Sequence, residues 1–161
     1  MIGLLQRVTS SSVTVDGNVI ASIDAGLMVL VAIEAGDTEV TAAKLLRKIT
    51  RYRVFSDADG KMNLSLLDTE GGLLLVPQFT LTADTGRGLR PSFSKGASAI
   101  DGARLFDTLV NLTDELDCRV QTGQFGANMQ VSLVNDGPVT FWLQEPRHNL
   151  VRAITQSGVS T

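Results

Sequence analysis

The sequence predicts a single compact α/β domain in which mixed and antiparallel sheet is combined with two main helices. Three observations lead to this prediction: strand-like and helix-like hydrophobic patterns alternate, two segments place apolar residues at helical spacing, and the 161 residues are 43% hydrophobic and 19% charged. A chain of this length can bury one core. We expect residues 1–145 to form the domain and residues 146–161, which lack the dense core pattern, to form a tail that is either mobile or binds a partner.

Four strands are expected before the first helix, over residues 4–8, 12–15, 18–23 and 26–33. Asp16-Gly17 is a two-residue turn, so the strands on either side of it form a hairpin. The run at residues 26–33 is continuously apolar, which is typical of a central strand. Thr38 opens the first helix, which runs to Tyr52 with its apolar residues on one face.

The second half of the chain continues the alternation. Residues 57–60 mark a turn, residues 73–76 form a buried strand that continues into residues 77–81, and residues 82–98 form a glycine-rich polar loop of functional character. The second helix is expected over residues 101–116. Three short strands close the domain, over residues 118–121, 129–134 and 139–143.

An unusual segment separates the last two of these strands: Asn135-Asp136-Gly137-Pro138-Val139-Thr140. Proline cannot donate to a sheet ladder, and glycine weakens a strand because it has no side chain to pack. The bond before a proline is also where a cis peptide is cheap. On spacing alone, the segment is a turn between two strands.

The composition excludes several classes of protein. A single cysteine, Cys118, rules out an internal disulfide framework and suits a reducing compartment. The single histidine, His148, lies in the polar tail, which argues against a histidine-based catalytic arrangement and against a zinc site of His and Cys ligands. No apolar run reaches the roughly 20 residues of a membrane helix, and the first residues lack a signal-peptide pattern. We therefore expect a cytoplasmic protein that has no cofactor and does not use histidine in catalysis.

The chain has a net charge of −3 but contains two clusters of basic residues. Lys44, Arg47, Lys48 and Arg51 share one face of the first helix, and a charged face of this kind is ordinarily just solvated. The second cluster, Arg87, Arg90 and Lys95, alternates with glycines in the long loop. Glycines let backbone amides approach a phosphate that arginines can clamp. The charge pattern supports a local contact with one end of a nucleic acid.

Four short motifs follow one another along the chain: Lys61-Met62-Asn63-Leu64-Ser65, Val76-Pro77-Gln78-Phe79-Thr80-Leu81, Arg90-Pro91-Ser92-Phe93-Ser94 and the Asn135–Thr140 segment. Together, in this order and spacing, they make the chain closely resemble the D-aminoacyl-tRNA deacylases. The second motif is similar to the Ser-Gln-Phe-Thr-Leu motif of that family. The similarity runs from residue 5 to about residue 142, so it covers nearly everything except the tail.

The resemblance implies a barrel-like core and a homodimer whose active sites lie at the subunit interface. The implied substrate is the 3′ end of a transfer RNA that carries a D-amino acid or glycine, and the ester to the terminal adenosine is hydrolysed. The Gly-Pro of one protomer is expected in cis and inserted into the pocket of the other. The implied catalytic residues are Gln78, Phe79 and Thr80. Among the implied substrate-binding residues, Phe125 and Met129 line the adenosine pocket, and Arg7 braces the Gly-Pro. The other two substrate-binding residues are Gly137 and Pro138 themselves.

The implied chemistry suits a chain without a usable histidine. An aminoacyl ester is already activated, so oriented main-chain donors and a well-placed water or ribose hydroxyl can lower the remaining barrier. A stiff Gly-Pro backbone would exclude L-amino acids by steric clash, which filters more strongly than an added contact. Thr80 orients a neighbour or packs against it, because no base that could activate it as a nucleophile is evident.

One residue departs from the resemblance, since Pro77 stands where the family usually has serine. Proline removes a hydroxyl and a backbone N–H. Either that serine is structural and a strand edge tolerates proline, or this chain binds without catalysing; the intact Gln78, Phe79, Thr80 and Gly-Pro favour the first. Two alternatives remain open: a non-catalytic module that binds tRNA ends, and a hydrolase of another ester with Thr80 as nucleophile.

Overall fold

One long strand, β1 (Ile2–Val15), organises the sheet. In the computed structural model, which describes residues 1–86 and 88–146, β1 pairs antiparallel with β2 (Asn18–Ile23), β3 (Gly26–Ala32) and β8 (Gln130–Gln144). The turn between β1 and β2 has φ angles of 48° at Asp16 and 79° at Gly17. Two positive φ angles are what a two-residue hairpin turn requires, so the predicted hairpin is confirmed.

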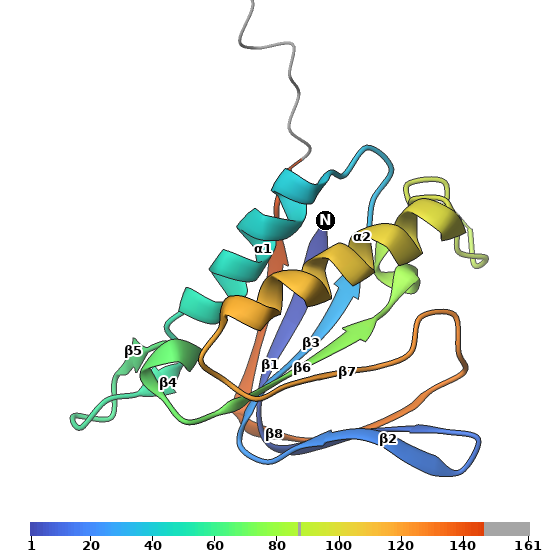
Figure 1. Ribbon diagram of the computed structural model, residues 1–161. Coiled ribbons are helices and arrows are strands. Elements are labelled where there is room, and N and C mark those ends of the chain that lie inside the picture. Colours follow the sequence, from blue (N-terminus) through green and yellow to red (C-terminus); the bar gives the residue numbers. More distant parts are fainter. Residues whose placement is uncertain (87, 147–161) are drawn as a thin grey trace, which may run out of the picture.

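The rest of the sheet is parallel. β6 (Gly72–Pro77) pairs with β3 on one side and with β7 (Val120–Thr122) on the other, which gives the order β2-β1-β3-β6-β7 with β8 alongside β1. The sheet curls into a nearly closed, barrel-like form (Figure 1). The predicted fold class, an α/β domain with a mixed, barrel-like sheet and two main helices, is therefore confirmed. Separately, β4 (Phe55–Ser56) and β5 (Met62–Leu64) enclose the predicted turn at residues 57–60.

The described residues contain two α-helices, α1 (Glu39–Arg51) and α2 (Ala99–Asn111), which cover the same face of the sheet (Figure 1). The Thr38 side chain caps α1 by accepting a hydrogen bond from the Thr41 amide, as its place at the predicted start requires. Both helices bury their apolar stripes against the strands. The opposite face of the central strands holds a second apolar cluster, so both faces are covered and the strands are apolar throughout.

Several predicted element boundaries are wrong. Residues 4–8 and 12–15, expected as two strands, belong to the single strand β1. The second helix begins earlier, at Ala99 behind the Ser98 cap, and gives way after Asn111 to a 3₁₀-helix, η3 (Leu112–Glu115). The strand expected to continue to residue 81 ends at Pro77, and the chain turns into another 3₁₀-helix, η2 (Phe79–Thr82).

A further difference concerns the two strands expected on either side of the Gly-Pro, which form the single strand β8. Pairing with β1 resumes beyond the Gly-Pro because the extra residues are accommodated as a bulge. A third 3₁₀-helix, η1, spans Leu66–Asp68.

The predictions for Arg87, His148 and the tail beyond Pro146 lie outside the described residues. Within residues 1–86 and 88–146, no helix is both long and apolar enough to cross a membrane.

Candidate functional site

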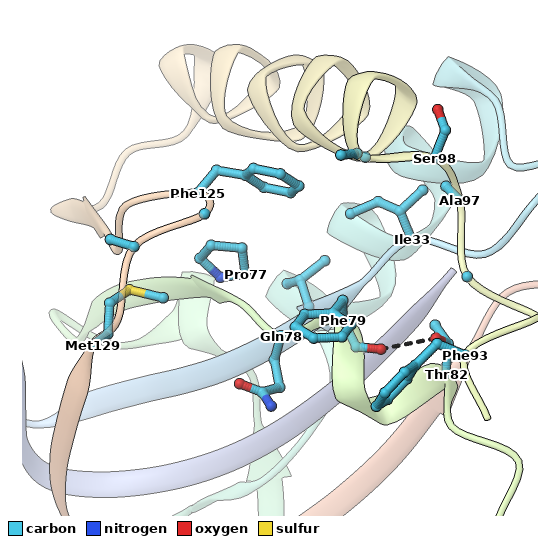
Figure 2. A pocket seen from close by; sticks show the side chains of 16 residues that line it. Ile33, Pro77, Gln78, Phe79, Thr82, Phe93, Ala97, Ser98, Phe125 and Met129 are labelled. Atoms are coloured by element: carbon cyan, nitrogen blue, oxygen red, sulfur yellow. Dashed lines mark hydrogen bonds between the residues drawn. The ribbon is translucent and has the colours of Figure 1, made fainter. Parts of the chain in front are cut away.

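A cavity of about 420 Å³ opens where β6 ends and η2 begins. Its walls come from the end of β3, from η2, from the loop before α2, from the first turn of α2 and from the segment between β7 and β8 (Figure 2). The larger apolar side chains that line it are Ile33, Pro77, Phe79, Phe93, Phe125 and Met129. None of the described lining residues has an ionisable side chain.

Gln78 and Phe79 are positioned by the turn from β6 into η2. The backbone N–H of Gln78 donates to the Val31 carbonyl at 2.7 Å, which fixes the start of η2 to the end of β3. The buried Thr82 hydroxyl donates to the Phe79 carbonyl at 2.8 Å, as Figure 2 shows. The Phe79 ring packs edge-on against Phe93, with ring centroids 5.0 Å apart, and both rings are exposed. These two aromatic residues therefore form a wall of the cavity that faces solvent.

Phe125 and Met129 line the opposite side of the cavity (Figure 2). The Phe125 ring lies 6.3 Å from that of Phe106 in α2, and a Cβ placed on Gly102 of α2 would come within 3.1 Å of it. The Met129 sulfur accepts a hydrogen bond from the Gln124 amide at 3.3 Å. The fold thus brings Phe125 and Met129 into the same cavity as Gln78 and Phe79, although they are far apart in the sequence.

Thr80 lies outside the cavity lining. Its side chain is exposed in η2, and its hydroxyl accepts a hydrogen bond from the side-chain amide of Gln78. The backbone amides of Phe79 and Thr80 have no acceptor among the described residues, because η2 begins without a capping side chain. Thr80 is therefore placed to orient Gln78, and two free amides lie at the start of η2.

The sequence suggested that Pro77 is tolerated at a strand edge. β6 lies inside the sheet, between β3 and β7, yet Pro77 removes no ladder hydrogen bond. In a parallel sheet, alternate residues of a strand bond to opposite neighbours. Gln78 bonds to β3, whereas Leu73 and Leu75 bond to Arg119 and Gly123 on the β7 side. Pro77 follows Leu75 by two residues, so its nitrogen points to the same side, toward β7. Because β7 ends at Thr122, opposite Leu75, no residue of β7 lies opposite Pro77.

The Gly137-Pro138 segment forms a bulge in β8. Gln6 pairs with Thr140 and Val8 pairs with Asn135, so residues 136–139 lie opposite Arg7 alone. The Gly137-Pro138 peptide bond is cis, as the resemblance implied, and Gly137 has a φ of 128°. Both residues are exposed.

Hydrogen bonds from Asn135 fix the bulge from within. Its Oδ1 accepts from the Val139 amide at 2.7 Å, and its Nδ2 donates to the Thr140 hydroxyl at 2.8 Å and to the Val139 carbonyl at 3.3 Å. One side chain therefore spans the whole bulge and holds it in a fixed shape.

Arg7 holds the bulge from the facing strand. Its Nε contacts the Asp136 carbonyl at 3.2 Å and the Asp136 carboxylate at 3.1 Å, and its Nη1 donates to the Val54 carbonyl at 2.5 Å. The guanidinium of Arg7, whose side chain is 13% exposed, therefore links the residue before Gly137 to the segment that follows α1.

The predicted site residues thus fall into two groups. Gln78, Phe79, Phe125 and Met129 share the cavity, whereas Arg7, Gly137 and Pro138 do not line it. In the sheet order, β3 and β1 lie between β6 and β8, and the bulge lies opposite Arg7 of β1.

Sequence reasoning assigned no role to Phe93 and did not single out Ile33, Thr82 or Ser98 in the cavity. Phe93 lies within one of the recognised motifs, which was the available signal. Thr82 follows Phe79 by three residues, a spacing that brings the two together only in a helical turn and not in the strand that was expected.

The basic loop cluster is partly neutralised. Lys95 pairs with Asp84 at 3.4 Å, and the Gly86 amide, together with Lys95, lowers the pKa of the Asp84 carboxyl. Among residues 1–86 and 88–146, no group of three or more His, Cys, Asp or Glu side chains could hold a metal ion.

Comparison with known proteins identifies the family. The family model described as D-Tyr-tRNA(Tyr) deacylase matches residues 4–144. The chain belongs to the D-Tyr-tRNA(Tyr) deacylase family. It is 60% identical over 144 residues to a D-aminoacyl-tRNA deacylase of Pseudomonas fluorescens and 56% identical over 144 residues to one of Escherichia coli, with 89% of this chain and 99% of each relative covered.

Two solved structures share the fold of this chain. A c-Myc DNA unwinding element binding protein is 36% identical with a TM-score of 0.86, and 91% of this chain and 99% of that chain are covered. A probable eukaryotic D-amino acid tRNA deacylase has a TM-score of 0.75 at 18% identity, with coverage of 88% and 97%, and so supports the fold alone. All the deacylase site residues proposed from the sequence lie within the matched residues 4–144.

Proposed function

We propose that this chain hydrolyses the ester bond of D-aminoacyl-tRNA, releases the free D-amino acid and tRNA, and accepts glycyl-tRNA as well. The observation that carries this proposal is the cavity, in which Gln78 and Phe79 meet Phe125 and Met129 within a chain of the deacylase family. The 56–60% identity to proteins named D-aminoacyl-tRNA deacylase supports the same substrate class. A tRNA substrate would place the enzyme in the cytoplasm.

The cavity can hold the 3′ end of the substrate in two parts. Its apolar side, with Phe125 and Met129, offers surfaces against which the terminal adenine can pack. Its polar side is the start of η2, where Gln78 lies beside the free amides of Phe79 and Thr80. In this arrangement the adenosine binds on the apolar side, and the ester carbonyl points toward the amides.

Catalysis in such a cavity relies on position and main-chain donors. Because no described lining residue is ionisable, none of these side chains can act as a general base near neutral pH. The aminoacyl ester is already activated, and amides aimed at the developing oxyanion stabilise the transition state. The ribose hydroxyl next to the ester, or a water held beside it, supplies the attacking oxygen.

Chiral selection is assigned to the cis Gly137-Pro138 segment of a second copy of the chain, which enters the cavity. The segment is exposed, is held by Asn135 and Arg7, and does not line the cavity of its own protomer. A fixed backbone rejects an L-side chain by steric clash, whereas a D-side chain or the hydrogen of glycine points away.

A homodimer follows from this assignment. The apolar side chains of Val134 and Trp142 are exposed on β8 and give a second copy apolar surface to bury. Each of the two sites would then combine the cavity of one protomer with the bulge of the other.

Neither alternative function has comparable support. A Thr80 nucleophile would have to act from outside the cavity lining, with its hydroxyl already bonded to Gln78. A module that only binds tRNA ends would leave the free amides of η2 without a role.

The test compares D-tyrosyl-tRNA, L-tyrosyl-tRNA and glycyl-tRNA and follows the loss of the ester. We expect rapid release from the D- and glycyl-esters and none above background from the L-ester. Tight binding without release from any of them would contradict the proposal and favour a binding module.

Mixed dimers test the shared site. Two inactive variants, Gln78→Ala and Gly137→Ala, should regain roughly a quarter of the wild-type activity after co-refolding, because half the dimers then contain one intact site. No recovery in mixtures that form dimers would place the bulge and the cavity outside a common site.

A further inference from the structure

A second hollow, of about 370 Å³, lies along the outer side of α1. Its lining consists of Lys44, Arg47, Lys48, Arg51, Tyr52 and Glu145. The lining thus contains four cations and one carboxylate, in a chain whose net charge is −3. We call this hollow the basic groove.

Helical spacing, one contact with β8 and one with Glu145, the residue after β8, create the basic groove. The four cations recur three or four residues apart, which places them on one side of α1. Lys48 pairs with Glu145 at 3.0 Å, and the Tyr52 ring packs edge-on against Phe141 with centroids 5.3 Å apart. The groove is therefore bounded by α1 and by Glu145, which directly follows β8.

This position puts the basic groove on the side of the molecule that carries Gly137-Pro138. Val54, two residues after Tyr52, accepts a hydrogen bond from Arg7, and Arg7 also holds Asp136 next to Gly137. Figure 1 shows α1 running alongside β8. The groove lies well away from the cavity, with which it shares no lining residue.

The concentration of positive charge is unfavourable for the helix alone. Like charges at these spacings repel and destabilise a helix, and Lys48 is paired with Glu145. A polyanion that follows the groove would relieve the repulsion. Arg47 and Arg51 are exposed and so can reach phosphates outside the protein.

We propose that the basic groove binds the sugar–phosphate backbone of the tRNA acceptor stem, in the protomer that donates its Gly137-Pro138 segment to the other copy. This inference rests on the proposed function, which places the 3′ end of the tRNA in the partner's cavity beside that segment. The stem then leaves the cavity across the donor protomer and meets α1. Contacts to phosphates fix the orientation of a nucleic acid without reading its sequence. Such contacts suit an enzyme that acts on tRNAs of different sequence.

The test removes three charges from the groove in the variant Lys44→Ala/Arg47→Ala/Arg51→Ala. The control, Lys61→Ala/Arg119→Ala, removes exposed cations from the β4–β5 turn and from the far edge of the sheet. Two substrates are compared, D-tyrosyl-tRNA and D-tyrosyl-adenosine, which carries the same ester without a stem. Affinity for uncharged tRNA is measured separately by fluorescence anisotropy over a range of salt concentrations.

We expect the groove variant to raise KM for D-tyrosyl-tRNA and Kd for uncharged tRNA by roughly tenfold or more, because phosphate contacts dominate such affinities. The slope of log Kd against log salt should fall by about 2 to 3, at roughly 0.7–0.9 per lost contact. Its kcat/KM for D-tyrosyl-adenosine should stay within about twofold of the wild type, and the control should match the wild type on both substrates.

Unchanged tRNA affinity and salt slope in the groove variant would overturn the inference. So would an equal loss on both substrates in a variant that unfolds at the wild-type temperature, because the groove would then act on the chemistry. Failure of the wild type to hydrolyse either ester, with groove-dependent tRNA binding intact, would instead overturn the proposed function and leave the groove assignment standing.

Discussion

The cavity and the Gly137-Pro138 bulge are built by different means. The cavity is made by packing, since several elements converge on it and its walls are mainly apolar. The bulge is made by hydrogen bonds between two strands and stands exposed on β8. The cavity can receive a ligand because it is hollow, and the bulge can act as a probe because its backbone is fixed.

The comparison teaches that each region lacks what the other supplies. The described cavity lining is largely apolar and has no ionisable group. The bulge has a fixed backbone, but its residues do not line the cavity of their own protomer. The following predictions test whether the two regions depend on each other, in order of decreasing effect.

Gly137→Ala should have the largest effect. A Cβ at this position would lie 2.7 Å from the Val139 Cγ2 and 3.1 Å from the Arg7 Nη2, at a φ of 128° that L-residues rarely adopt. Displacing the bulge by about 1 Å should lower the rate of D-tyrosyl-tRNA deacylation by roughly 100-fold or more, measured under single-turnover conditions.

The control is Gly17→Ala in the β1–β2 turn. Its φ of 79° is also positive, but a Cβ there has no neighbour within 4 Å. We expect a loss of stability of about 1 kcal/mol with unchanged deacylation. Equal activity loss in both variants would mean that the bulge has no special role.

Arg7→Ala should come next. The variant leaves the Asp136 and Val54 carbonyls without their charged donor, so we expect a loss of about 2 kcal/mol in unfolding free energy and a roughly 30-fold slower reaction. Arg7→Lys should recover little, because an ammonium cannot span both carbonyls. Chemical denaturation and single-turnover rates measure the two effects. Full recovery by lysine would show that charge alone matters.

Gly102→Ala tests the apolar side of the cavity. A Cβ would lie 3.1 Å from the Phe125 ring and should displace it, which we expect to raise KM about three- to tenfold. Stability should hold or increase, because alanine favours the helix by about 1 kcal/mol over glycine. Steady-state kinetics and thermal unfolding separate the two effects. An unchanged KM would argue against substrate contact with Phe125.

Thr80→Val should have a smaller effect. It removes the acceptor for the Gln78 amide, and one hydrogen bond of about 1 kcal/mol corresponds to a roughly fivefold slower reaction. Thr80→Ser keeps the acceptor and should behave like the wild type. If Thr80→Val abolished turnover altogether, the nucleophile hypothesis would regain support.

The smallest effect is expected in the pH dependence of kcat/KM. With no ionisable group in the described cavity lining, kcat/KM for D-tyrosyl-adenosine should show the same inflections between about pH 5.5 and 8.5 as uncatalysed hydrolysis of that ester. An additional inflection would reveal a catalytic acid or base that the cavity lining does not contain.

The sequence predicted most of the strands and the start of the first helix because these depend on local signals. Asp16-Gly17 determines its turn by backbone preference, and Thr38 determines its helix start by capping. The apolar run before that helix signals a strand with both faces covered. Local patterns of this kind act over a few residues and can be read directly from the chain.

The errors arose where tertiary contacts decide the local structure. Pro77 ended β6 without breaking the sheet, because its nitrogen faces the side on which β7 has already ended. The Gly-Pro did not end β8, because Asn135 and Arg7 carry the pairing around the bulge. Neither partner is visible from the pattern of the segment itself.

The candidate site was predicted through motifs and not through geometry. The motifs named Gln78, Phe79 and the Gly-Pro, but the separation of these residues into a cavity and a remote bulge depends on the strand order. Thr82 was missed because the segment was expected to be a strand.

The pairing of β1 with β8 has a consequence for folding. Ile2 in β1 pairs with Gln144 in β8, so this pairing can form only after almost all of the described chain has been synthesised. Contacts between such distant residues close large loops and form late, after the local β1–β2 hairpin. The bulge exists only once Val8 and Asn135 are in register on one side of it and Gln6 and Thr140 on the other. Catalytic competence should therefore be the last property that a newly made chain acquires.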